Sequence, residues 1–158
     1  MKNTITIERS ELQQQIDLRN FYMGDSARRT DKDADTIQSS KDDEELLFMF
    51  IDTACNELVT AVALRFPSIS HTIDEKEITF ALETHKEQRD DLLNMLKQSI
   101  IDYLVNEAIM QWLLLRRSNM AQPQVSLRES LYRNVQQMFA KLYNTNKIRR
   151  RATNLAGI

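Results

Sequence analysis

Apolar residues spaced three and four positions apart, the period of one face of an α-helix, recur along most of the chain. The pattern predicts long helices over residues 40–66, 86–117 and 126–143. A shorter helix is expected over residues 11–23, with Gly24 well placed to end it. We therefore predict a mainly α-helical protein, a small bundle with one long central helix. The last helix is expected to bury a stripe of apolar residues: Leu127, Leu131, Val135, Met138, Phe139 and Leu142.

Strict alternation of apolar and polar residues, the period of a β-strand, occurs in two short places. Residues 72–83 alternate at Ile78, Phe80 and Leu82, and residues 4–7 are a suitable partner for them. An isolated strand pair is only marginally stable in water, so these strands must pack against the helices. We expect a short β segment, either a hairpin or a strand pair.

The helix expected over residues 86–117 differs from the others because apolar residues cover most of its circumference between Ile100 and Leu115. A helix that is apolar on nearly every side is buried on more than one side. It is therefore either the central helix of the domain or a helix whose outer side meets another chain. Trp112 lies in this stretch and has two interpretations: a core residue, or an anchor in a subunit interface, where tryptophan often dominates the binding energy.

Composition divides the chain into three parts. Residues 1–41 hold the first strand and helix and a polar, acidic loop; residues 42–143 form the helical core with the β segment; residues 144–158 form an extended basic arm. From Asp25 to Glu45 there are eight acids and four bases, a net charge of −4. The D-K-D-A-D run in this segment lacks the glycine and closing glutamate of a calcium-binding loop, so we interpret it as a solvated acidic loop.

The overall composition narrows the environment of the protein. Only two glycines and two prolines occur in 158 residues, which suits long helices and few tight turns. The single cysteine, Cys55, rules out an internal disulfide and falls at an apolar helical position, as a small core residue does. No apolar run reaches the roughly twenty residues that span a membrane, and no signal peptide is recognisable. We expect a soluble protein from a reducing compartment, without membrane association.

The sequence contains no motif that carries known chemistry. His71 and His85 both lie beside expected turns, without a cysteine or a second histidine at the spacing of metal ligands. No phosphate-binding glycine loop, dinucleotide-binding motif or nucleophile elbow occurs. The carboxylates are numerous but form no specific pair for acid–base work. The sequence therefore predicts that the protein is not an enzyme and needs no cofactor, and it assigns no catalytic or metal-binding residue.

The C-terminal arm carries the strongest functional signal. From Lys141 to the end of the chain there are five basic residues and no acid, and apolar residues are interspersed among them. Three interpretations remain open: a disordered solubilising tail, a contact to nucleic-acid phosphates, or docking on a neighbouring subunit. Docking accounts for the apolar residues, which an electrostatic tail does not need. The interface residues predicted in this way are Lys147, Ile148, Arg149, Arg150, Arg151, Leu155 and Ile158.

Residues 42–158 also show a distinctive order of elements. DDEELLFMFIDTACNELVTAVALRF is followed by a short β segment, a long helix ending NEAIMQWLLLRR, and the helix SLRESLYRNVQQMFAKLYN before the basic tail. This order resembles the head–tail connector (adaptor) proteins of tailed bacteriophages and prophages, although the β segment at residues 77–83 departs from their simplest helical members.

The resemblance implies a structural role in a virus particle. Subunits of this family form a homo-oligomeric ring, commonly twelvefold, below the portal, and insert C-terminal arms into their neighbours. Portal and tail or neck proteins would be the partners, and DNA would pass through the channel without sequence-specific contact. The protein would assemble in the host cytoplasm and end in the virion neck. Opposite charge at the two ends of the chain favours such head-to-tail contacts, which close into rings.

Two other functions remain open on the same residues. The chain is also compatible with another virion assembly component, a tail-completion or tail-terminator protein. A third hypothesis is a DNA-binding regulatory protein that uses Arg149, Arg150 and Arg151, whose affinity would fall steeply with salt.

Overall fold

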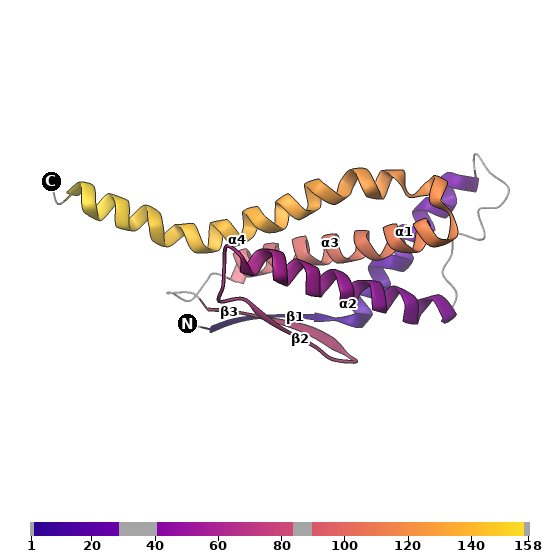
Figure 1. The fold of residues 1–158 in the computed structure, drawn as a ribbon, viewed down its shortest axis with the longest axis horizontal. Coiled ribbons are helices and arrows are strands. Elements are labelled where there is room, and N and C mark those ends of the chain that lie inside the picture. Colours follow the sequence, from indigo (N-terminus) through magenta and orange to yellow (C-terminus); the bar gives the residue numbers. More distant parts are fainter. Residues whose placement is uncertain (1, 29–40, 84–89, 157–158) are drawn as a thin grey trace.

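The computed structural model describes the backbone of residues 2–28, 41–83 and 90–156, and the side chains of residues 2–20, 43–83 and 90–142. Within these ranges the chain is mainly helical, with four α-helices and a small three-stranded antiparallel sheet (Figure 1), which confirms the predicted fold class. The elements are β1 (Lys2–Glu8), α1 (Arg9–Arg28), α2 (Lys41–Ala63), β2 (Ser70–Ile73), β3 (Glu77–Glu83), α3 (Asp90–Arg116), the 3₁₀ turn η2 (Ser118–Met120) and α4 (Gln122–Ala156).

The sheet has the order β1-β3-β2, with β3 in the centre and antiparallel to both neighbours. The predicted pairing of the N-terminal strand is confirmed, with Ile5 opposite Phe80. The β segment expected over residues 72–83 is a hairpin of β2 and β3, one of the two predicted forms, with a hydrogen bond from the Asp74 N–H to the Glu77 carbonyl at its turn. Alternate residues of β1 and β3 are buried, so one face of the sheet lies against the helices.

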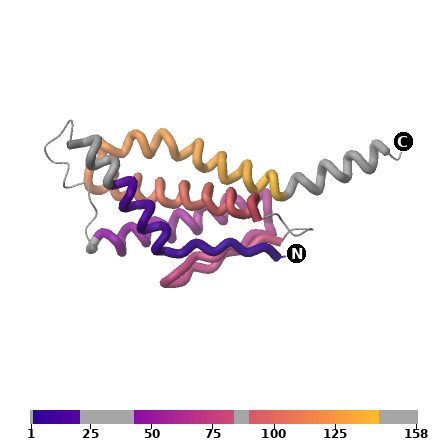
Figure 2. Tube along the Cα trace, turned by 180° about the vertical axis from the view of Figure 1, so that it is seen from behind, coloured from indigo at the N-terminus to yellow at the C-terminus, as the bar shows by residue number. Residues whose placement is uncertain are grey.

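Helix α3 is the centre of the molecule. In both views it lies between α4 on one side and α2 on the other, and the sheet lies on the same side as α2 (Figures 1 and 2). It contacts α1, α2, α4 and β1, and nearly every residue from Ile100 to Leu113 is buried. The apolar circumference seen in the sequence is thus largely covered by the chain's own elements, and the prediction of a central helix is confirmed.

Several helix boundaries differ from those expected. The backbone of α1 continues past Gly24 to Arg28, because a glycine inside a helix costs only about 1 kcal/mol. Helix α4 continues to Ala156 instead of ending near Tyr143, and this stretch contains neither glycine nor proline to stop it. The start of the helix expected at residue 86 lies outside the described residues, which resume at Asp90.

Helix α2 corrects one expectation about membranes. Its stretch Asp43–Ala63 is long and apolar enough, by length and composition, to span a membrane. The same stretch packs one face into the core, and Asp52 within it forms an ion pair with Arg9, with 3.0 Å between Oδ1 and Nη2. A core helix of a folded domain has this character, and we interpret α2 as such.

Arg9, at the junction of β1 and α1, fastens three elements together. Its backbone N–H donates to the Lys76 carbonyl, and its Nε donates to the Asp74 carbonyl, so it holds the β2–β3 turn. Its guanidinium also lies 5.2 Å from the centre of the Phe48 ring on α2. With the Asp52 ion pair, these contacts fix the sheet against α2.

We expect Leu104→Ala to lower the free energy of unfolding by about 2–5 kcal/mol, because Leu104 is fully buried on α3 and its truncation leaves a cavity. Leu64→Ala is the matched control, since Leu64 is 86% exposed and its truncation should change stability by less than about 0.5 kcal/mol. Denaturant unfolding followed by circular dichroism measures both. Equal effects at the two positions would contradict the assignment of α3 as the core helix.

Candidate functional site

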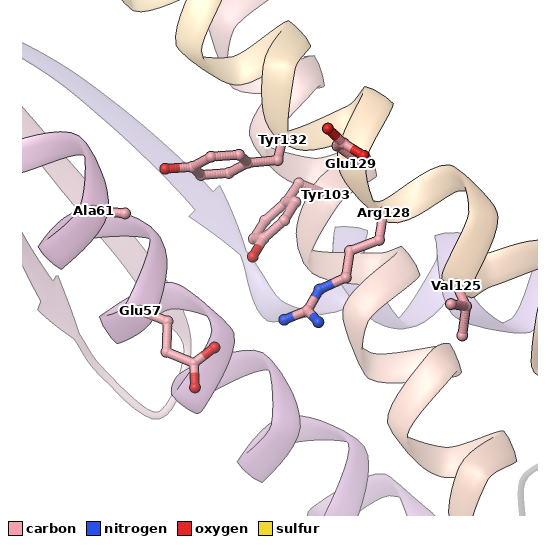
Figure 3. Close-up of a pocket in the computed structure, with 7 residues that line it drawn as sticks. All are labelled: Glu57, Ala61, Tyr103, Val125, Arg128, Glu129 and Tyr132. Carbon is pink, nitrogen blue, oxygen red and sulfur yellow. The ribbon is translucent and has the colours of Figure 1, made fainter.

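A groove with a cavity of about 390 Å³ lies between α2 and α4, with α3 as its floor (Figure 3). The segment just after α2 contacts α4 at one end of the molecule, where the rings of Phe66 and Phe139 stack with centroids 6.0 Å apart. The groove is lined by Glu57 and Ala61 of α2, Tyr103 of α3, and Val125, Arg128, Glu129 and Tyr132 of α4.

A buried ion pair joins α3 to α4 beside the groove. The Arg128 Nε lies 2.6 Å from Oε1 of Glu107; the Glu107 side chain is 3% exposed and that of Arg128 is 48% exposed. Burial raises the pKa of Glu107, the positive charge of Arg128 opposes the rise, and Glu57 adds to it. The carboxylate is therefore held in an unfavourable environment that one arginine compensates.

Two tyrosines form an aromatic wall of the groove. Tyr103 is buried, and the rings of Tyr103 and Tyr132 lie 6.0 Å apart at 49°. Burial raises the pKa of Tyr103 to about 12, and the charge of Glu107 contributes in the same direction. A phenol with this pKa stays protonated at neutral pH and is a poor general base.

A second feature is a set of exposed apolar side chains around the α3–α4 turn. Leu114 and Leu115 end α3, Val125 and Leu127 begin α4, and all four are exposed. We call these four residues the turn surface. No side chain between residues 122 and 134 of α4 is buried. The expectation that Leu127 belongs to the core stripe is wrong, because this half of α4 packs on α3 but does not close against α2.

Polar contacts hold the turn surface in place. The Asn106 side chain donates a hydrogen bond of 3.0 Å to the Gln124 carbonyl at the start of α4. Arg116, at the end of α3, forms an ion pair with Asp43 at the beginning of α2, with 3.1 Å between Nη2 and Oδ1. The apolar side chains are therefore presented by a fixed helical framework.

The predicted interface residues fall into two groups, Trp112 on α3 and the residues of the C-terminal arm. Trp112 is 2% exposed and packs in the core of its own chain, which is the first of its two interpretations. Its side chain was ambiguous because a buried and an interfacial tryptophan show the same helical spacing. Of the arm residues, Lys147, Ile148, Arg149, Arg150, Arg151 and Leu155 lie on the backbone of α4, but their side chains, and all of Ile158, lie outside the described residues.

The described residues among the other candidates, Cys55 and His71, are held by contacts within the fold. Cys55 is buried, and its burial, with a smaller contribution from Asp52, raises the thiol pKa to about 12. It is an unreactive core residue, as expected. The His71 Nε2 lies 2.7 Å from the Asn56 Oδ1, and its ring stacks on Phe80. His85 and the D-K-D-A-D run lie outside the described residues, and no metal-binding group of three His, Cys, Asp or Glu occurs among the residues that are described.

No family model matches the chain, and no curated protein or solved structure is significantly similar to it. The groove and the turn surface are therefore the basis for assigning a function.

We expect Glu107→Gln to stabilise the protein at neutral pH relative to the wild type. Because the pKa of Glu107 is raised above its ordinary value of 4.5, its contribution to stability is fully present below about pH 4.5 and is lost as the pH rises through the folded pKa. Glutamine keeps a hydrogen-bond acceptor for Arg128 without the charge. Denaturant unfolding between pH 4 and pH 8 should show an advantage of the variant that grows with pH, and parallel pH profiles would contradict this account.

Proposed function

We propose that this chain is a structural assembly subunit, and specifically a ring-forming head–tail connector that joins a phage portal to the tail. The observation that carries the proposal is the turn surface. Four large apolar side chains at the end of α3 and the beginning of α4 are left exposed, and exposed apolar side chains near one another mark contact surfaces for other proteins. The four residues of the turn surface lie within a short stretch of chain at one end of the bundle.

The position of the turn surface supports a contact between rigid bodies. Its residues lie on two helices that are anchored to the core through the Arg116–Asp43 and Arg128–Glu107 ion pairs. A surface held in this way loses little conformational freedom on binding, which favours stable association. Contacts between different surfaces of identical subunits generate rings when the rotation from one subunit to the next closes.

The basic arm supplies the second part of the proposal. Its apolar residues, together with Lys147 and Arg149–Arg151, suit docking on a neighbouring subunit or on the portal. The acidic segment from Asp25 to Glu45 provides opposite charge elsewhere on the chain. Acidic side chains facing the channel of such a ring would repel DNA phosphates and allow the duplex to slide. A tail-completion or terminator protein shares the same interface features and is distinguished by its position in the particle.

We expect Leu115→Glu to weaken association by roughly tenfold or more, because a charge would be buried in the contact that Leu115, 64% exposed in the single chain, makes on assembly. Leu64→Glu is the control, since Leu64 is exposed at the end of α2 remote from Asp43 and Arg116. Mass photometry of the full chain, alone and with its portal, measures the oligomer. A wild-type chain that stays monomeric under both conditions would overturn the proposal.

Deletion of residues 147–158 should reduce assembly, because it removes the predicted interface residues of the arm. The unfolding transition of the core should stay nearly unchanged, because the core cluster of the described side chains, which runs to Leu142, keeps all its members. The same truncated chain tests the DNA-binding alternative. If the arm binds nucleic acid, the full chain binds duplex DNA at low salt, with an affinity that falls steeply as salt increases, and the truncated chain does not. Retained assembly together with lost DNA binding would favour the regulatory function over the connector.

A further inference from the structure

Strand β1 lies at an edge of the sheet, because the strand order is β1-β3-β2. Its other side pairs with no strand among the residues that the structure describes. The strand also contains no proline, which would weaken further pairing. An edge of this kind presents backbone N–H and C=O groups that can pair with a strand of another chain.

The hydrogen bonds of the sheet decide which residues of β1 face this edge. The Arg9 N–H donates to the Lys76 carbonyl, and these two residues continue the β1–β3 register. Hydrogen-bonded and non-hydrogen-bonded pairs alternate along an antiparallel ladder, so the odd-numbered residues of β1 bond β3. The even-numbered residues direct their N–H and C=O groups to the outer edge. These residues are Lys2, Thr4, Thr6 and Glu8.

The space beside this edge is open. A cavity of about 410 Å³ lies against Thr4, Ile5 and Thr6, and the beginning of α3, from Asp90 to Lys97, forms its other wall. Successive residues of a strand point to opposite faces of the sheet, so a cavity that touches three in a row lies at the strand's edge. The side chains of the even-numbered residues of β1 are all exposed.

We propose that β1 is a homodimer interface, in which the β1 edges of two copies pair antiparallel about a two-fold axis, with Ile5 opposite Ile5. In this register each residue that faces the edge lies opposite another such residue: Lys2 opposite Glu8, and Thr4 opposite Thr6. Opposite residues of this kind exchange two backbone hydrogen bonds. The contact joins the two three-stranded sheets into one continuous sheet.

The side chains match in the same register. Lys2 and Glu8 have opposite charge, are both exposed, and meet at two symmetry-related places. Within one chain Glu8 lies opposite Glu77, a like-charge pair that is unfavourable, and a lysine on the other side of Glu8 offsets it. A shift of the register by two residues in either direction keeps the hydrogen-bonding pattern but separates the two charges.

A second copy fits this edge better than an unrelated peptide, because the strand is its own complement. Along KNTITIE a base at one end and an acid at the other flank two threonines placed symmetrically about Ile5. An antiparallel partner needs this order reversed, and a second copy supplies it. The contact uses no residue of the turn surface or of the arm. It is isologous, whereas ring contacts join different surfaces, so it is separate from the proposed ring.

Disulfide trapping tests the register on the full chain. Thr4→Cys chains mixed with Thr6→Cys chains should form a linked dimer under mild oxidation, because opposite residues have Cα atoms about 5.5 Å apart. Either variant alone should link much more slowly, since identical positions are then two residues out of register and beyond the reach of a disulfide of about 7 Å. The native Cys55 does not compete, because it is buried and its pKa is raised to about 12.

Charge reversal tests the pairing of Lys2 with Glu8. Added to both trapping chains, Lys2→Glu or Glu8→Lys should each slow linkage roughly five- to thirtyfold, because two attractive pairs become repulsive. The two changes together exchange the charges and should restore the original rate. Glu45→Lys is the matched control, since it reverses an exposed acid on α2 and should leave the rate unchanged. Circular dichroism verifies that every variant is folded.

Each outcome supports or overturns the dimer. Mixed chains that link no faster than either variant alone overturn it, and so does a double reversal that fails to restore the rate. Faster linkage of Thr4→Cys alone or of Thr6→Cys alone overturns the register. Leu115→Glu, which weakens the ring contact, should leave linkage unchanged. Failure of the dimer and failure of the ring are therefore distinguishable.

Discussion

The burial of α3 is the constraint that organises this protein. Between Ile100 and Leu113 this helix is apolar on nearly all sides, and a single chain covers it only by placing elements around it. Helices α1 and α2 and strand β1 cover part of its surface, and α4 covers another part. Because α2 and α4 both pack on α3 without covering the part of it at Tyr103, a groove remains between them.

Two arginines show how burial sets the role of a charge in this fold. The Arg9 side chain is largely buried, and its guanidinium is used by the β2–β3 turn and by α2. Arg128 is half exposed and uses its Nε to neutralise the buried Glu107, while the rest of its side chain lines the groove. Arg9 connects the sheet to α2, whereas Arg128 connects α3 to α4 and also lines the groove.

The turn surface and the groove share the first half of α4. Val125 belongs to both, since it lines the cavity and is one of the exposed apolar residues beside the turn. Neither feature was predicted from the sequence, where Leu127 looks like a core residue and Glu57 like any exposed acid on an amphipathic helix. Both features arise where helices that are far apart in the sequence come together in space. A single sequence contains no direct signal of such contacts.

The sequence by itself determined the types of element and the central place of α3, because hydrophobic periods of 3.6 and 2 follow directly from helix and strand geometry. It also determined the pairing of the first strand with the strand at residues 77–83, since both have one apolar face to bury. Only the tertiary structure decided that Trp112 is covered within its own chain and that Leu127 is not. A periodic pattern shows which face of a helix is apolar, but the number of elements that cover this face depends on how the whole chain packs.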